Sequence, residues 1–501
     1  MNTDSVRPAV TELRLSAFKT HRGVTLPLGP LTLLSGPSGS GKSSALQAYA
    51  ILARLGSGES LARALAEVAG GPSGCVPTGA RPDGQGRRGF RIGCTVDGPA
   101  GPVSLDLAVQ AEPELRIVGE RLTGGGETLL TTALTDPTRP AVQAAWHTAG
   151  ATPVTRAPLP DDRLGTSLLP LRVAGKTAGQ RLVLAAAEQV VVALRSAFVC
   201  DPRPEVMRAV GAGGAGGGCG GAGGHGGGAA GPGAGGGVRP SGRGGAAGGG
   251  AAGKAPGKPG AAGGVGTAGA RGAGGRRGSA GSGEAGGWGH GAQEQRDEGR
   301  LRSACDNLPT VLARTSRECA RRHAVLVAAV REACAGPVEG LHTVPLRPDG
   351  AGAADAGAAV AGAVVGRDDG RPGGGSSGAR AVPAAGGAEG VRAVLDRGEL
   401  GELPVEQLGD GELRFLALAL VLLTGPDVLA MDPVGEVPSA HQQMTVLADG
   451  MDRCMDGRQA RELVSLAARM TERGHVRLLG TVRDPTVADG LPGVQVLHLG
   501  V

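Results

Sequence analysis

The chain has 501 residues, including 95 Gly and 34 Pro but only 4 Phe, 2 Trp and 1 Tyr. Its formal net charge of +5 is small and does not by itself predict a polyanionic partner. Eight cysteines with no C-x-x-C pair indicate neither a zinc site nor a disulfide framework.

The N-terminus lacks the basic start and apolar stretch of a signal peptide. The longest apolar run, over 415–423, is much shorter than the roughly 20 residues that a membrane-spanning helix needs. We therefore expect a cytoplasmic protein with no membrane insertion.

Residues 1–199 predict the first half of an α/β domain. Alternation of apolar and polar residues, or apolar runs after glycine-containing turns, predicts strands within 11–17, 24–28 and 31–35. A helix over 44–55 is expected next, because its apolar residues recur on one face. Short β-like runs between 89 and 132 predict an antiparallel meander, and 180–199 predicts a second helix.

Two tracts rich in Gly and Ala divide the rest of the chain. Residues 200–300 and 348–390 offer too little apolar surface to order themselves, so we expect disordered insertions. Within the first tract, residues 209–283 hold seven basic residues and no acidic one. This composition fits either added non-specific affinity for nucleic acid or a linker with no binding role.

A helical lobe over 301–347 lies between the two tracts, and 391–501 predicts the second half of the α/β domain. There we expect two short strands, a helix from Gly411, a strand over Asp427–Met431 and helices to about Arg473. Strands near 475–482 and 494–499 complete the expected elements.

A phosphate-binding motif follows the third predicted strand. The sequence fits G-x-x-x-x-G-K-[ST], and we assign nucleotide contacts to Gly36, Pro37, Ser38, Gly39, Ser40, Gly41, Lys42, Ser43 and Ser44. Glycines let successive backbone N–H groups point at phosphates, and the following helix presents its N-terminus to them. Lys42 is expected to reach the β- and γ-phosphates as a catalytic residue, while Ser43 ligates Mg²⁺. The motif therefore predicts ATP, or a similar nucleoside triphosphate, bound with Mg²⁺.

A carboxylate at the end of an apolar strand is the expected partner of such a loop. The segment Asp427–Asp432 has this form, so Asp432 is the predicted Mg²⁺ residue. The alternative is an ordinary strand that ends in an Asp-Pro turn.

A second glycine turn, Leu408 to Glu412, opens the helix from Gly411. Gly409, Asp410 and Gly411 either form another phosphate-sensing helix terminus or belong to a core helix capped by Asp410.

These pieces in this order resemble the ATPase heads of the RecF, SMC and ABC superfamily. The resemblance is specific around 11–55, which includes the step Ala17-Phe18-Lys19, and around 408–433. It implies an α/β P-loop NTPase fold with an ABC-ATPase-like head, a mixed central sheet, an antiparallel β subdomain and a helical lobe that carries the Gly-rich insertions. It also implies an ATP-dependent homodimer, in which each P-loop faces the partner's signature loop at 409–411.

Several positions depart from the pattern of that family. Gly409 replaces the signature serine, and Pro433 occupies the place of the catalytic glutamate after the Walker B aspartate. Glu436 is the nearest carboxylate and the candidate general base. No switch histidine is found in the stretch 480–484. We therefore expect slow hydrolysis.

Three functions fit these features. The first is a RecF- or SMC-like ATPase that acts on DNA in repair or genome maintenance. The second is a nucleotide-dependent scaffold or regulator with little ATPase activity. The third is the nucleotide-binding subunit of a transporter, although such subunits carry the signature serine and switch histidine that are missing here. ATP-dependent DNA binding would favour the first function.

Overall fold

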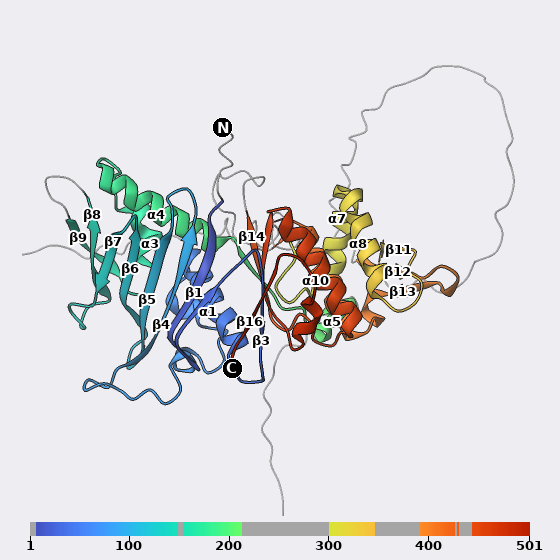
Figure 1. The fold of residues 1–501 in the computed structure, drawn as a ribbon, viewed down its shortest axis with the longest axis horizontal. Coiled ribbons are helices and arrows are strands. Elements are labelled where there is room, and N and C mark those ends of the chain that lie inside the picture. The colour runs from blue at the N-terminus through green and yellow to red at the C-terminus, as the bar shows by residue number, and fades with distance from the viewer. Residues whose placement is uncertain are drawn as a thin grey trace, which may run out of the picture. The chain divides into compact units, whose positions relative to one another are not determined.

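Three β-sheets and the helices packed on them form the part of the chain that the structure describes (Figure 1). This computed structural model describes residues 7–148, 154–212, 300–345, 391–425, 428–429 and 443–500. All of them belong to one of the two units of the chain, which comprises 1–216 and 290–501.

The largest sheet has eight strands in the order β2-β1-β4-β5-β6-β7-β8-β9, and each neighbouring pair is antiparallel. Its strands are β1 (Ala9–Phe18), β2 (His21–Pro27), β4 (Arg88–Asp97), β5 (Val103–Glu112), β6 (Arg116–Gly124), β7 (Glu127–Ala133), β8 (Ala141–His147) and β9 (Val154–Pro160). The predicted antiparallel meander is confirmed, and it extends beyond residue 132 by two strands.

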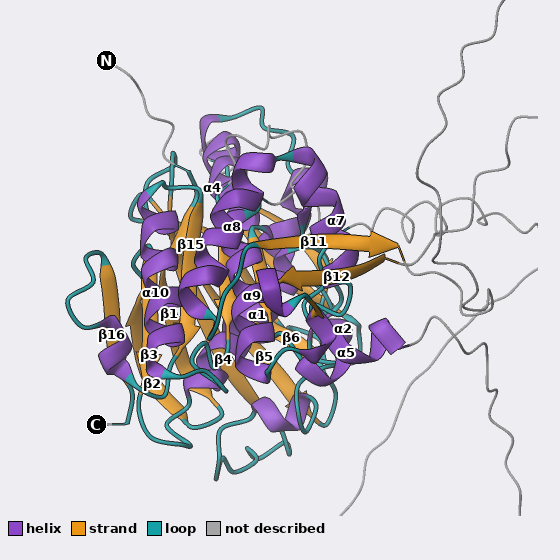
Figure 2. Cartoon of the chain, turned by 90° about the vertical axis from the view of Figure 1, so that its right-hand side faces the viewer, coloured by secondary structure: helices purple, strands orange, loops and turns teal. Residues whose placement is uncertain are grey.

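The second sheet is parallel and has five strands in the order β10-β14-β15-β3-β16. Its strands are β10 (Ala197–Cys200), β14 (Met444–Ala448), β15 (Val476–Thr481), β3 (Leu31–Ser35) and β16 (Val494–His498). The third sheet is antiparallel and small (Figure 2), with β11 (Gly340–Pro345), β12 (Val391–Asp396) and β13 (Glu402–Pro404).

Helices cover both faces of the parallel sheet. The α-helices are α1 (Lys42–Gly56), α2 (Leu61–Ala64), α3 (Gly165–Leu168), α4 (Ala178–Arg195), α5 (Pro204–Ala212), α7 (Leu308–Glu318), α8 (Ala320–Ala333), α9 (Asp410–Leu423) and α10 (Gly457–Glu472). Short 3-10 turns are η1 (Pro72–Cys75), η2 (Leu169–Leu171), η3 (Gly398–Leu400), η4 (Val405–Gln407) and η7 (Pro485–Ala488). No helix in these described ranges combines the length and apolar character needed to cross a bilayer.

Helix α1 lies between the two large sheets and contacts strands of both. Its buried face includes Leu46, Tyr49 and Leu52, at the helical spacing that the sequence predicts. One hydrophobic core joins α1 and α4 to the eight-stranded sheet, and a second core joins α7, α8, α9 and α10 to the opposite face of the parallel sheet. Packing from both sides explains why the parallel strands are apolar along their length.

Three expectations from the sequence need correction. The resemblance implies a mixed central sheet, whereas the structure separates the parallel and antiparallel strands into different sheets. Helices were expected up to about Arg473, but 444–448 is the buried strand β14 in the middle of the parallel sheet. The expected disordered insertion starts too early at 200, because α5 is held by the buried side chain of Met207 and by the contacts of Arg208.

The segment Asp427–Met431 is described only at Val428 and Leu429. Leu429 forms an isolated parallel bridge with Leu301, outside the five-stranded sheet. The tracts 213–299 and 346–390 lie outside the described residues, and so do Asp432, Pro433 and Glu436.

Candidate functional site

The glycine loop connects the end of β3 to the start of α1, and two of its glycines have no room for a side chain. Gly36 has φ of 142°, and a Cβ there would lie 2.2 Å from the Leu499 carbonyl oxygen. Gly41 has φ of 94°, and a Cβ there would lie 2.4 Å from Nε2 of His21. Both positions combine a left-handed backbone with close packing, so only glycine fits.

The N-terminus of α1 is open to an anion. Gly41 is its N-cap residue, and no side chain caps the helix. The amides of the first turn have no acceptor within the helix, and their partial positive charge favours a phosphate. Nζ of Lys42 donates to the carbonyl oxygens of Gly36 at 2.6 Å and Pro37 at 3.0 Å, which folds the ammonium group over the loop. The predicted P-loop residues are therefore brought together in the loop after β3 and the first turn of α1.

A carboxylate faces this turn from the parallel sheet. Oγ of Ser43 donates to Oδ1 of Asp449 at 3.1 Å, and Oγ1 of Thr481 donates to the same oxygen at 2.6 Å. Asp449 follows β14 and Thr481 ends β15, so parallel strands bring both groups to one edge of the sheet. Ser43 and Asp449 are both exposed. A hydroxyl and a carboxylate are hard oxygen donors, and they fit Mg²⁺.

The turn after Asp449 is fixed by contacts to two other elements. The Gly450 amide donates to Oγ1 of Thr481 at 2.7 Å. Nη2 of Arg414, a buried residue of α9, donates to the carbonyl oxygens of Asp449 at 3.1 Å and Gly450 at 3.0 Å. Further along, Oδ2 of Asp452 accepts from the amides of Arg483 at 2.6 Å and Asp484 at 2.9 Å. Helix α9 and the segment after β15 thus both hold this turn.

The hairpin between β1 and β2 forms another wall of the P-loop. Nε2 of His21 lies 3.0 Å from the Gly41 carbonyl oxygen, and His21 is buried. Nζ of Lys19 donates to Oε1 of Gln47 in α1 at 2.6 Å. Lys19 is part of the family resemblance, but the sequence predicts no role for His21, because a single histidine in a strand belongs to no recognisable motif.

The signature-like loop lies at the start of α9. Gly409 is the N-cap residue, its amide donates to Oε2 of Glu412 at 3.1 Å, and the carboxylate of Asp410 pairs with Nη2 of Arg208 at 2.7 Å. Asp410 is thus the first helical residue, not the cap. Gly411 is buried, and a Cβ there would lie 2.2 Å from the Cys454 carbonyl oxygen. Across the described ranges, no hydrogen bond joins 409–411 to the P-loop of the same chain.

The carboxylate of Asp449 is the residue that sequence reasoning missed. The pattern of an apolar run followed by Asp occurs in 427–432 and again in 444–449. The sequence predicts the first copy as the metal-site strand, because it follows the signature-like helix, and predicts a helical region for the second. The roles predicted for Asp432 and Glu436 stay predictions, since these residues lie outside the described part of the chain.

Comparison with known proteins found no matching protein-family model and no matching curated protein. Among solved structures, the chain is similar to an SMC head bound to the C-terminal winged-helix domain of ScpA, with 10% identity, a TM-score of 0.38 and coverage of 96% of this chain and 91% of that one. It is also similar to the SMC head domain of Thermotoga maritima, with 10% identity, a TM-score of 0.33 and coverage of 97% and 92%.

A third similar structure is an SMC head with an extended coiled coil, bound to a ScpA domain from Pyrococcus furiosus. It has 9% identity, a TM-score of 0.36 and coverage of 96% of this chain and 91% of that one. All three TM-scores lie below 0.5, so these structures carry no part of the function proposed below.

Proposed function

We propose that this protein is an ATPase head of the RecF, SMC and ABC type that binds ATP with Mg²⁺ at Gly36–Ser44. One observation carries the proposal, which is the contact between Ser43 at the start of α1 and Asp449 at the end of β14. An open helix N-terminus, a lysine over the glycine loop and a hydroxyl–carboxylate pair together supply the donors that a Mg²⁺–triphosphate requires.

Each group has a distinct role in this proposal. The amides of the loop and of the first turn of α1 would bind phosphate oxygens, and the Lys42 ammonium group would pair with the β- and γ-phosphates. Ser43 and Asp449 would hold the metal ion, which would supply positive charge against the phosphates. Thr481 keeps the Asp449 carboxylate oriented through its 2.6 Å hydrogen bond.

The same geometry supports slow hydrolysis. The residue after Asp449 is Gly450, which has no side chain to act as a base, and Met451 follows it. A positioned general base contributes roughly 10²–10⁴-fold to rate. We infer a protein that loads ATP, changes state and hydrolyses slowly, as a nucleotide-dependent switch would.

We further propose that ATP brings two copies together and that the assembled protein acts on DNA. The exposed start of α9 at Gly409 and Asp410 supports dimerisation, because it offers a helix terminus that its own P-loop does not use. The DNA partner comes from the resemblance to RecF- and SMC-type heads, and the sheet face described below bears on it.

A pair of matched variants tests the metal assignment. Asp449→Asn and Asp432→Asn each remove one negative charge with little change in size. We expect Asp449→Asn to weaken Mg²⁺-dependent ATP binding in isothermal titration, and Asp432→Asn to leave it near wild type. If Asp432→Asn weakens binding and Asp449→Asn does not, the carboxylate predicted from the sequence holds the metal, and our assignment of Asp449 is wrong. If neither variant changes the Mg²⁺ dependence, both assignments fail.

A further inference from the structure

The eight-stranded sheet has one covered face and one hollowed face. Helix α4 packs across the covered face and contacts β1, β4, β5, β7 and β8. The other face carries a groove of about 370 Å³ over β1, β4, β5, β6 and β7 and a second groove of about 500 Å³ beside it. Both grooves are lined by Arg91 and Ala108, so they form one continuous depression, which we call the outer groove.

The strand register explains why the side chains on this face leave a shallow groove. Residues on the outer face alternate with buried leucines, such as Leu105 and Leu107 of β5. Along one register row the outward residues are Arg14, Gly93, Asp106, Arg121, Thr131, Ala145 and Arg156. The adjacent row reads Ala17, Arg91, Ala108, Gly119 and Ala133. Between the arginines, most outward side chains are therefore no larger than threonine.

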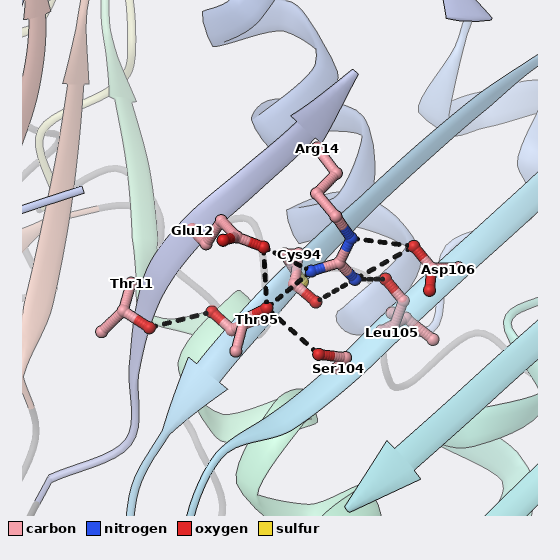
Figure 3. A network of polar contacts seen from close by, with 8 residues as sticks. All are labelled: Thr11, Glu12, Arg14, Cys94, Thr95, Ser104, Leu105 and Asp106. Carbon is pink, nitrogen blue, oxygen red and sulfur yellow. Dashed lines mark hydrogen bonds and ion pairs between the residues drawn. The ribbon is translucent and has the colours of Figure 1, made fainter. Parts of the chain in front are cut away.

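Asp106, the acidic residue of these rows, and Glu12 of β1 both pair with Arg14 (Figure 3). Nη1 of Arg14 donates to Oε1 of Glu12 at 2.8 Å, and Nε donates to Oδ1 of Asp106 at 3.0 Å. Its other donors bind Thr95 and the carbonyl oxygens of Cys94 and Leu105. The N–H donors of Arg14 are therefore all used, and the cluster of Arg14, Glu12 and Asp106 carries one more negative than positive charge.

Three exposed arginines on the same face have no such partner. Within the described ranges, Arg91, Arg121 and Arg156 take part in no ion pair or side-chain hydrogen bond. Arg91 and Arg121 line the outer groove, and Arg156 lies in the Arg121 register row. With strands about 4.8 Å apart, the backbones of β4 and β6 lie about 10 Å apart and those of β6 and β9 about 14 Å apart. The charge is thus spread across the sheet and not confined to one point.

We propose that the outer groove binds the phosphate backbone of duplex DNA through Arg91, Arg121 and Arg156. This inference rests on the proposed action on DNA and names the surface that contacts the DNA. Three arginines without an ion-pair partner outnumber the one excess negative charge of the Arg14 cluster, so this face attracts phosphates, and small residues between the arginines let a rigid backbone approach the sheet. A protein partner is a poorer fit, because protein interfaces gather aromatic residues, whereas Phe90 and Trp146 of this sheet are buried on its other side.

Salt-dependent binding of a short fluorescent DNA duplex tests the proposal on the full chain with Mg²⁺ and ATP. The test variant is Arg91→Gln/Arg121→Gln/Arg156→Gln. The matched control is Arg172→Gln/Arg321→Gln/Arg461→Gln, which removes the same charge from exposed arginines elsewhere. Each phosphate contact contributes about 0.9 to the slope of log K against log salt, so we expect the test variant to lower that slope by about 2.7 and the control to change it little.

Several outcomes would overturn the outer groove as a DNA site. These are equal losses in both triple variants, no loss in either, no binding of DNA by the wild type, or binding of polyglutamate in preference to DNA. Restoring the charge with lysine at the three positions should recover most of the slope, because phosphate attraction needs the cation. ATP titration of the same proteins separates the two proposals, since the test variant should keep wild-type ATP affinity. If the wild-type protein does not bind ATP, the proposed nucleotide site is wrong instead.

A single substitution offers an independent check. A Cβ on Gly119 would meet no atom closer than 3.7 Å, so a side chain there projects into the outer groove without disturbing the fold. Gly119→Glu should weaken DNA binding by filling the groove and pairing with the arginines, whereas Gly119→Ala should not. Unchanged binding by a folded Gly119→Glu protein contradicts the proposal.

Discussion

Ser43 and Asp449 are 406 residues apart in the chain, yet their side chains are hydrogen-bonded at 3.1 Å. The hydroxyl belongs to the first turn of α1, and the carboxylate follows the last residue of β14. The contact links the start of α1 to the edge of the parallel sheet. Any ligand held by the P-loop therefore meets a carboxylate from the C-terminal half of the chain.

Replacing Lys42 with alanine should weaken ATP binding while leaving the fold intact. The ammonium group is the cation that folds over the glycine loop, and hydrogen bonds to charged groups are worth about 1.5–3 kcal/mol. That range corresponds to roughly 10- to 150-fold in affinity. Isothermal titration measures the loss, and Lys176→Ala, an exposed lysine outside the P-loop, is the control. Equal ATP affinity in a folded Lys42→Ala protein would refute the P-loop assignment.

ATP with Mg²⁺ should shift the protein from monomer to dimer. Gly409 and Asp410 are exposed at the start of α9 and bind no group of their own P-loop in the described structure. A partner's nucleotide would give this helix terminus a ligand. Multi-angle light scattering with and without ATP measures the change, and Lys42→Ala should stay monomeric under both conditions. A wild-type protein that remains monomeric at saturating ATP counts against the dimer.

Hydrolysis should be slow, below about one ATP per second, because a missing general base costs roughly 10²–10⁴-fold. Glu436 is the carboxylate predicted from the sequence, and Asp452 is the next carboxylate after Asp449 in the described structure. A phosphate-release assay on Glu436→Gln and Asp452→Asn shows whether either one acts as the base. Rapid turnover that survives both substitutions would show that another group activates water.

The stability of the antiparallel sheet should depend on the ionisation of Glu120. Its carboxylate is buried and accepts from the amides of Gly165 and Thr166, each at 2.7 Å. Burial raises the pKa of Glu120, and the hydrogen bonds from Thr166 and Gly165 oppose that rise only in part. The folded protein therefore binds a proton that the unfolded chain releases, so stability falls as pH rises from the ordinary glutamate value, about 4.3, through the raised pKa.

Denaturant unfolding across this pH range measures the effect. The unfolding free energy of the wild type should decline as pH rises, and that of Glu120→Gln should be flatter, because the glutamine does not titrate. Glu472→Gln, an exposed residue of α10, should follow the wild type. Parallel curves for Glu120→Gln and the wild type would show that this carboxylate does not control the pH dependence.

Much of the local structure follows from short-range pattern. The P-loop, the helix α1 and the meander can be predicted because each depends on residues close together in sequence: glycines at fixed spacing, apolar residues at helical period and alternation along strands. The prediction of phosphate binding by Gly36 to Ser44 depends on the same short segment, and the structure places these residues in the loop after β3 and the first turn of α1.

The choice of the carboxylate opposite Ser43 depends on tertiary structure alone. Asp427–Asp432 and Met444–Asp449 are both apolar runs that end in aspartate, so the local sequence pattern predicts a metal-binding carboxylate equally well at either one. Strand pairing brings the second run to Ser43, because β14 pairs with β15, and β15 pairs with β3, which leads into the P-loop. The β15–β3 pairing joins segments from the two ends of the chain, such as Leu478 and Leu31, and both pairings depend on burial from both faces of the sheet. The outer groove has the same origin, since its arginines share a face only after six strands have set their register.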